Sequence, residues 1–488
     1  MYYLFGNMQL EDWAQKVVDE ARSKYGSVEV KKTGNRYYLS RVSSVYDPEK
    51  KRARKISGEY LGRITPQGLV KAEKRRSSPR SVYEYGNGRF LHDVSYPLIH
   101  GLQVHFSAFW REIIAMAIVK ATRSTPMKYM SAQWEKLYLS RNVEANVSPQ
   151  YLSQALRSVG KDWASQRSFF SDLMDKKETI LFDLSSIFSR SENIRMAEKG
   201  YNRHHVNVRQ INFAMAFSSK RHLPVMLKSL PGSVRDVKSL HSTMEEFDLG
   251  GYRIILDRGF FSYKNVEYFM THGIEFIQPL KRGSILIDYA LAMESSFTYK
   301  DRGIRCVRRD ITMTMRAHIS WDHDTRIFLY LYEDVKLRGE EESSLIVLIG
   351  KGKIRSYDKE KLGKVSIISN IDAPASEIYE QYKSREEVEQ AFDDMKNELE
   401  EDKTYLQDDE SVWGYFFVVF LSIYMHFRVL GIIRSHDLAG KLSVKEVILQ
   451  LSRIYMVTYA DGKTGLLEIP KKVEDLLKDL RLNILPKL

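Results

Sequence analysis

Two acidic residues lie inside or at the end of apolar segments, where packing alone does not explain them. Asp183 is in the middle of ILFDLSSIF, and a carboxylate there is costly unless it reaches a sheet edge, a partner or a metal ion. Asp257 ends the apolar run of IILDRGFF, a position from which α/β sheets present side chains to ligands. Because acids also end strands as turn formers or caps, neither residue by itself identifies a site.

A later segment, PASEIYEQYKSREEVEQAFDDMKNELE, has the periodicity of a helix, with Pro374 near its first turn. At 100° per residue, four of its side chains project within a stripe about 60° wide. The stripe contains Tyr382, Arg385, Glu389 and Lys396. It combines a phenol, a carboxylate and two cations on one face. A salt-bridged solvent face is the simpler alternative, because most charged helix stripes are of that kind.

Carboxylates on three separate elements suit metal-dependent phosphoryl transfer. Two divalent ions about 4 Å apart can activate an attacking hydroxyl and stabilise the leaving oxygen of a phosphodiester. Mg²⁺ and Mn²⁺ prefer carboxylate oxygens, and neighbouring Arg and Lys side chains can then bind phosphates. Two other candidates fit less well. His204 and His205 have no further His or Cys at zinc spacing, and Asp236 fits a helix cap better than a metal ligand.

The acids and the charged stripe together resemble the signature of a known family. The strand around Asp183, the segment from Asp257 to Asn265 and the spacing Tyr-x2-Arg-x3-Glu-x6-Lys resemble insertion-sequence transposases of the DDE superfamily. Within that superfamily the resemblance is to the group with a Tyr-Arg-Glu-Lys signature. One departure is the pair Leu184-Ser185 after Asp183, where many relatives have a Thr at the second place.

The resemblance covers about residues 178–405 and implies a ribonuclease H-like catalytic core. In such a core two Mg²⁺ or Mn²⁺ ions would be bound by Asp183, Asp257 and Glu389. The enzyme would hydrolyse one strand at each transposon end, and the exposed 3′-hydroxyl would attack target DNA. The residues implied to contact phosphates near the cleaved end are Tyr382, Arg385 and Lys396. Double-stranded DNA and a second copy of the chain, as a homodimer in the synaptic complex, are the implied partners.

An α/β sheet is predicted to position the acids. Three strand-like runs (ETILFDLSSIF, QINFAMAFSS and LPVMLKSLPG) precede a helix, a strand, a second helix and a further strand. This order predicts a mixed sheet with flanking helices. We assign the ribonuclease H-like core to residues 178–282 and 371–460. Residues 283–370 are predicted to form a β-rich insertion between the second and third acids, with SSLIVLIG among its strand-like segments, and residues 461–488 a C-terminal tail.

The positive charge of the chain is concentrated near its N-terminus. The 488 residues have a formal net charge of +12, and residues 31–80 contain fifteen Lys and Arg against four acids. A helix at 11–25 and two extended segments joined by a charged turn predict a basic DNA-binding region over 1–100 that contains a β-hairpin. Residues 101–177 are predicted to be a helical linker or DNA-binding region. The hairpin residues predicted to bind DNA are Lys50, Lys51, Arg52, Arg54 and Lys55.

Composition excludes several classes of protein. Hydrophobic residues make up 43% of the chain, which is too apolar for a disordered protein. Cys306 is the only Cys, so an internal disulfide and a Cys-rich zinc site are excluded. The apolar run at 414–433 contains His426 and Arg428, which favours a buried helix over a membrane span. We therefore expect a cytoplasmic protein.

Two rival functions stay open at this level. One is a catalytically silent or domesticated DNA-binding protein, in which the basic segment alone is functional. The other is a metal-dependent nuclease on the same core. Trp321, Phe260 and Phe261 could stack on an unpaired base, but core packing is the expected role of all three.

Overall fold

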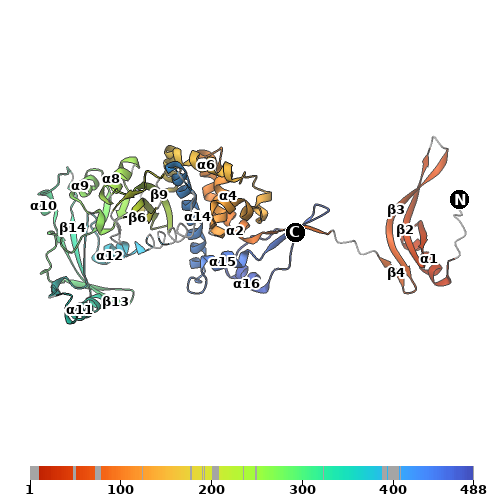
Figure 1. The fold of residues 1–488 in the computed structure, drawn as a ribbon. Coiled ribbons are helices and arrows are strands. Elements are labelled where there is room, and N and C mark those ends of the chain that lie inside the picture. The colour runs from red at the N-terminus through yellow and green to blue at the C-terminus, as the bar shows by residue number, and fades with distance from the viewer. Residues whose placement is uncertain are drawn as a thin grey trace. The chain divides into compact units, whose positions relative to one another are not determined.

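The structure is a computed structural model of the chain, and packing divides it into two units (Figure 1). One unit comprises Met1–Ser81 with Thr458–Thr464, and the other Val82–Val457 with Gly465–Leu488. The residues described are 10–47, 51–71, 78–123, 125–175, 178–189, 191, 193–200, 208–234, 236–247, 250–322, 324–354, 356–386, 389, 393, 406 and 408–486. The predictions for Lys50, His204, His205 and Lys396 lie outside these residues.

The N-terminal unit packs one helix on a four-stranded antiparallel sheet. The elements are α1 (Asp12–Tyr25), β1 (Val28–Thr33), β2 (Arg36–Asp47), β3 (Arg52–Thr65) and β4 (Gly68–Lys71), in the sheet order β1-β2-β3-β4. The apolar period of α1 buries its inner face against the sheet, with a core of Ala14, Val17, Val18, Ala21, Tyr37, Leu39 and Ile64. The predicted helix and the predicted basic hairpin are thereby confirmed as elements.

The larger unit is built on a ten-stranded mixed sheet. Its order is β12-β13-β14-β15-β11-β10-β6-β8-β7, and β9 pairs with β8. The predicted succession of elements is confirmed by β6 (Thr179–Phe188), β8 (Arg209–Ser218), β9 (Leu223–Pro231), α8 (Asp236–Glu246), β10 (Arg253–Ile255), α9 (Tyr263–Thr271) and β11 (Glu275–Pro279), with a short β7 (Glu198–Lys199) beside β8. β6 is antiparallel to β8 and parallel to β10, which is parallel to β11.

The segment between the second and third acids extends this same sheet. Its elements are β12 (Ser295–Tyr299), β13 (Arg302–Asp310), α10 (Thr312–Arg316), β14 (Phe328–Asp334), α11 (Val335–Gly350), η4 (Lys359–Lys361) and β15 (Lys364–Ser369). β15 pairs antiparallel with β11, so the insertion continues the core sheet. The prediction of a strand at SSLIVLIG is wrong, because this run forms the second half of α11. Asp334 caps α11 by accepting from Leu337 N–H at 2.9 Å, and a short apolar run does not distinguish a buried strand from a helix.

Helices and short 3-10 turns make up most of the remaining described part of the larger unit. They are α2 (Gly86–Val94), α3 (Tyr96–His105), α4 (Trp110–Thr122), η1 (Met127–Tyr129), α5 (Met130–Trp134), η2 (Tyr138–Arg141), α6 (Pro149–Lys161), α7 (Trp163–Leu173), α12 (Ala375–Lys383), α14 (Asp409–Ser435) and α15 (Val444–Leu451). Residue 100, the predicted end of the basic region, lies inside α3. A small sheet joins β5 (Pro79–Glu84), β16 (Tyr455–Tyr459) and β17 (Thr464–Leu466), and α16 (Lys471–Asp479) lies in the predicted tail.

Helix α14 is the central helix of the larger unit and packs between α4, α6 and β9 (Figure 1). By length and composition it could cross a membrane, but 72% of its most apolar stretch is buried inside the protein, as the prediction of a core helix requires. Its backbone closely approaches that of α6. A Cβ on Gly414 would lie 2.0 Å from the Leu156 carbonyl oxygen, and one on Gly160 would lie 1.8 Å from that of Glu410. Glycine at both positions therefore sets the spacing of the two helices.

Candidate active site

The register of two parallel strands brings the first two acids together. Leu181 of β6 pairs with Ile255 of β10, and continuing this register by two residues places Asp257 level with Asp183 on the same face of the sheet. Asp183 is 3% exposed, and its Oδ1 accepts a hydrogen bond from Leu184 N–H at 2.8 Å. Asp257 follows the end of β10, and its side chain is 26% exposed. The two carboxylates therefore lie on one face of the core sheet, on the neighbouring interior strands β6 and β10.

Two buried amides fix the loop that follows Asp257. Gln278 of β11 donates from Nε2 to the Asp257 carbonyl oxygen at 2.8 Å. Asn265 of α9 donates from Nδ2 to the Phe260 carbonyl oxygen at 2.8 Å. Both amides are 1% exposed, so the backbone on each side of η3 (Arg258–Phe260) is anchored in the core. Sequence reasoning missed Gln278, although a polar residue in the apolar strand IEFIQPL was a signal for it.

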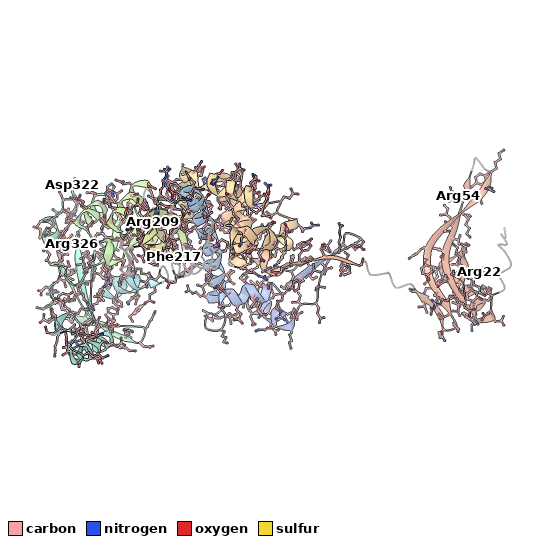
Figure 2. All side chains as sticks on the ribbon, viewed as in Figure 1. Arg22, Arg54, Arg209, Phe217, Asp322 and Arg326 are labelled. Carbon is pink, nitrogen blue, oxygen red and sulfur yellow. The ribbon has the colours of Figure 1, made fainter. Side chains whose placement is uncertain are left out.

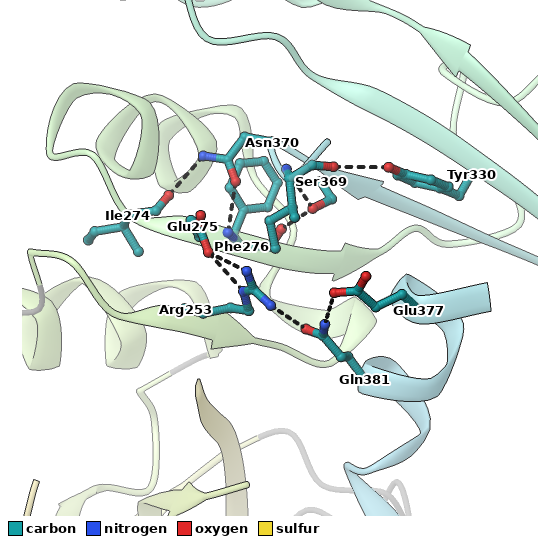
Figure 3. A network of polar contacts seen from close by, with 10 residues as sticks. Arg253, Ile274, Glu275, Phe276, Tyr330, Ser369, Asn370, Glu377 and Gln381 are labelled. Carbon is teal, nitrogen blue, oxygen red and sulfur yellow. Dashed lines mark hydrogen bonds and ion pairs between the residues drawn. The ribbon is translucent and has the colours of Figure 1, made fainter. Parts of the chain in front are cut away.

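A polar network joins α12 to the strands beneath it (Figure 3). Arg253, at the start of β10, donates to Glu275 at 2.8 Å and to Gln381 at 3.0 Å. Gln381 in turn donates to Glu377, one turn earlier in α12, at 2.9 Å. The network orients the end of α12, from which the charged stripe begins.

The charged stripe starts at the end of α12 rather than in the middle of one long regular helix. α12 ends at Lys383, and a turn follows it. Glu389 N–H then donates to the Arg385 carbonyl oxygen at 3.4 Å, which is helical spacing. Arg385 and Glu389 therefore project from the same side, as their spacing predicts.

Arg385 lies among the three predicted acids. Its Nη1 is 2.6 Å from Asp257 Oδ1, and its Nη2 forms an ion pair with Glu389. The Arg385 side chain is only 14% exposed. Burial alone would lower the pKa of Arg385, but the charges of Asp257 and Asp183 raise it above its ordinary value. We expected this guanidinium to face phosphate, and here it binds two of the acids and lies close to the third.

Tyr382 lies beside this cluster. Its ring centroid is 6.0 Å from the Arg385 guanidinium carbon. Burial raises the pKa of the Tyr382 phenol, and the charge of Asp257 raises it further against the opposing effect of Arg385. The phenol therefore stays protonated at neutral pH and can donate a hydrogen bond.

The three carboxylates suit hard divalent cations, but in this structure Arg385 lies between them. Carboxylate oxygens are the ligands that Mg²⁺ and Mn²⁺ prefer. Within the described ranges, no three His, Cys, Asp or Glu side chains are gathered closely enough to bind a metal ion as they stand. The residues that could hold ions are Asp183, Asp257 and Glu389, once the guanidinium leaves Asp257.

The hairpin places its basic residues on different faces. Asp47 pairs with Arg52, and Val45 with Arg54, so the two arginines share one face of the ribbon. Figure 2 shows Arg54 near the end of the hairpin, away from α1. Lys55 lies on the opposite face, and its Nζ is 2.5 Å from Glu29 Oε1. Lys51 is exposed in the turn.

The aromatic candidates for base stacking are mostly in the core. Trp321 is 6% exposed and Phe260 is 1% exposed, which agrees with the packing role expected for both. Phe261 is partly buried and contacts Tyr263 edge-to-face at 5.6 Å between ring centroids. Asp236 begins α8.

Comparison with known proteins identifies one sequence family. The family model described as "Transposase DDE domain" matches residues 176–425, just over half of the chain. A solved piggyBac transposase synaptic complex with hairpin DNA is similar in structure at 13% identity and a TM-score of 0.39, covering 78% of this chain and 77% of that chain. No curated protein sequence matches. The family assignment therefore rests on the sequence match.

Proposed function

The chain belongs to the DDE transposase family, and on that premise we propose that it is an insertion-sequence transposase of the Tyr-Arg-Glu-Lys group. The single observation that supports catalysis is the convergence of three acids, from β6, the loop after β10 and the segment after α12, around one half-buried guanidinium. Charged groups that strongly perturb one another in this way are concentrated at functional sites.

We propose that Asp183, Asp257 and Glu389 bind two Mg²⁺ or Mn²⁺ ions. When bound, such ions supply charge stabilisation for a phosphodiester transition state and lower the pKa of an attacking hydroxyl. The strand order β9-β8-β6-β10-β11, with its mixed directions, supports a ribonuclease H-like core beneath the acids. Tyr382 would donate from its protonated phenol to a phosphate oxygen, and Arg385 would bind phosphate after it leaves Asp257.

The proposed substrate is double-stranded DNA carrying the terminal inverted repeats of the element. The exposed hairpin of the N-terminal unit would bind these ends through Lys51, Arg52 and Arg54, because a two-stranded ribbon fits the major groove. Synapsis of two ends requires two copies of the chain, so a homodimer acting on DNA in the cytoplasm completes the proposal.

The test uses the full-length protein, Mg²⁺ and linear DNA that carries the ends of the element. We expect Asp183→Asn to abolish cleavage and leave end binding unchanged, because the substitution removes a charge without changing shape. Cleavage retained in this variant would refute the assignment of the triad.

A second assay separates the rival functions. A pre-cut end is incubated with target DNA in Mg²⁺, and joined products are measured. Cleavage without joining would favour a nuclease. End binding with neither activity in the wild-type protein would favour the DNA-binding alternative.

A further inference from the structure

Helix α11 has an outward face that no described part of the chain covers. None of the sixteen residues of α11 is buried, although positions 345–349 read Leu-Ile-Val-Leu-Ile. Ile346 is 56% exposed, Val347 51% and Ile349 38%. Burying such side chains stabilises by roughly 1.5–3 kcal/mol each, and exposed apolar groups gathered in this way mark interaction surfaces.

Small residues follow the same outward face. Gly339, Ser343 and Gly350 align with Ile346 in one stripe, because the four positions are spaced by four, three and four residues. A Cβ on Gly339 or Gly350 would meet nothing within 4 Å, so packing within the described chain does not require glycine at either position. Each glycine costs a helix up to about 1 kcal/mol relative to Ala. Small side chains let two helix backbones approach closely, as α6 and α14 do inside the core.

The charges on α11 and at its C-terminal cap are arranged to match a second, antiparallel α11. Glu340 in the helix and Lys351, the residue directly after it, are both exposed on either side of the Ile346–Val347 centre. At a rise of 1.5 Å per residue, Glu340 lies about 10 Å before this centre and Lys351 about 7 Å after it. An antiparallel copy therefore brings Glu340 within about 3 Å, along the axis, of the partner's Lys351, well within the reach of a lysine side chain. In a parallel copy Glu340 would lie level with the partner's Glu340 and Lys351 level with its Lys351, so opposite charges would not meet.

We propose that α11 is the self-association surface of this protein, through which two copies pair by antiparallel α11 helices around a two-fold axis. Ile346 and Val347 of both copies meet at the centre, and two Glu340–Lys351 pairs close the ends. Such an interface is isologous and so limits assembly to a dimer. The proposal deepens the homodimer of the proposed function, but it concerns the DNA-free protein and does not depend on catalysis.

The first test measures the mass of the full-length protein by sedimentation equilibrium without DNA. We expect a concentration-dependent dimer for the wild type and at least a tenfold higher dissociation constant for Ile346→Asp with Val347→Asp. Leu449→Asp is the matched control, because Leu449 is 62% exposed on α15 and should leave the dimer unchanged. Circular dichroism checks that each variant is folded. A monomeric wild type, or a dimer unaffected by the double variant, overturns the proposal.

The second test reverses the charges at the ends of the helix. Glu340→Lys alone and Lys351→Glu alone should each weaken the dimer several-fold, because each places like charges opposite one another. The two substitutions together should restore it. Failure of the combined variant to recover overturns the antiparallel pairing. Cleavage of end-carrying DNA, measured separately, reports on the proposed transposase activity, so the failure of one proposal is distinguishable from the failure of the other.

Discussion

Removal of the Arg385 guanidinium should destabilise the protein in the absence of divalent ions. Arg385 is 14% exposed and forms ion pairs with Asp257 and Glu389. In Arg385→Ala the three carboxyl groups lose their shared counter-cation. The same substitution should make divalent ions bind more tightly, because the Asp257 carboxylate no longer has to give up Arg385 first.

The size of the effect follows from the exposure of the partners. Breaking a fully buried ion pair costs about 3–5 kcal/mol, whereas an exposed pair contributes about 0–1 kcal/mol. The Asp257 side chain is 26% exposed and that of Glu389 is 43% exposed, so the ion pair with Asp257 contributes more of the stability than the pair with Glu389. We expect a loss of about 2 kcal/mol in the free energy of unfolding. If that free energy is the cost of displacing Arg385, Mn²⁺ should bind the variant about thirtyfold more tightly.

The assay is isothermal titration of Mn²⁺ into the DNA-free protein, together with thermal unfolding with and without Mn²⁺. Lys383→Ala is the matched control, because Lys383 lies over the Tyr379 ring at 5.7 Å. Its removal should change neither Mn²⁺ affinity nor the stabilisation by Mn²⁺. Weaker or unchanged Mn²⁺ binding in Arg385→Ala would refute the reasoning, since it would mean that the guanidinium organises the acids for the ion instead of competing with it.

Three further perturbations test the packing, the electrostatics and the DNA interface. Gly414→Ala should lower the free energy of unfolding by about 1–3 kcal/mol in chemical denaturation, because the added methyl group forces α14 away from α6. Gly431→Ala is the control and should be neutral or stabilising, because a Cβ there would meet nothing within 4 Å. Equal effects of the two substitutions would contradict the close approach of the helices. Arg221 and Ser218 lower the pKa of buried Glu178 against the opposing effect of burial. The ionised Glu178 carboxylate therefore contributes its full stabilisation of the fold above its unfolded pKa of about 4.3, and this contribution is lost as pH falls through its lower folded pKa. Glu178→Gln should lower the free energy of unfolding at pH 7 by about 2 kcal/mol and make it fall less steeply at acid pH. If stability falls just as steeply at acid pH in the variant, the Glu178–Arg221 pair is not the cause of that fall. Neutralising Arg52 and Arg54 should reduce the slope of log K against log salt by about 2 in an end-binding titration, and an unchanged slope would remove that face from the interface.

Much of the element order was predictable because it depends on local periodicity. The strands around Asp183 and before Asp257 are continuous apolar runs bounded by turn residues, and such runs keep their identity whatever surrounds them. The family was predictable for a related reason. The resemblance depends on residue types at short spacings, which the sequence contains, and the match over residues 176–425 confirms the DDE transposase family. The roles of the individual site residues stay predictions.

The run SSLIVLIG shows where local reasoning failed. Its β-branched residues favour a strand, but the cap at Asp334 starts a helix that continues through the run. Whether such a run is a strand depends on a neighbouring strand to pair with, and no local pattern contains that information. The exposure of Ile346 and Val347 was for the same reason invisible in the sequence.

By itself, the sequence determined which residues can do chemistry, the order of the elements that contain them and the concentration of charge in residues 31–80, because each depends on residue type and short spacing. Only the tertiary structure decided which groups meet. It placed Arg385 on Asp257 and Glu389, bound Gln278 to the loop after Asp257, joined the insertion to the core sheet through β15 and β11, and separated Arg54 from Lys55 by strand register. These contacts join residues up to about 130 positions apart, and their geometry arises from packing of the whole chain rather than from any local preference.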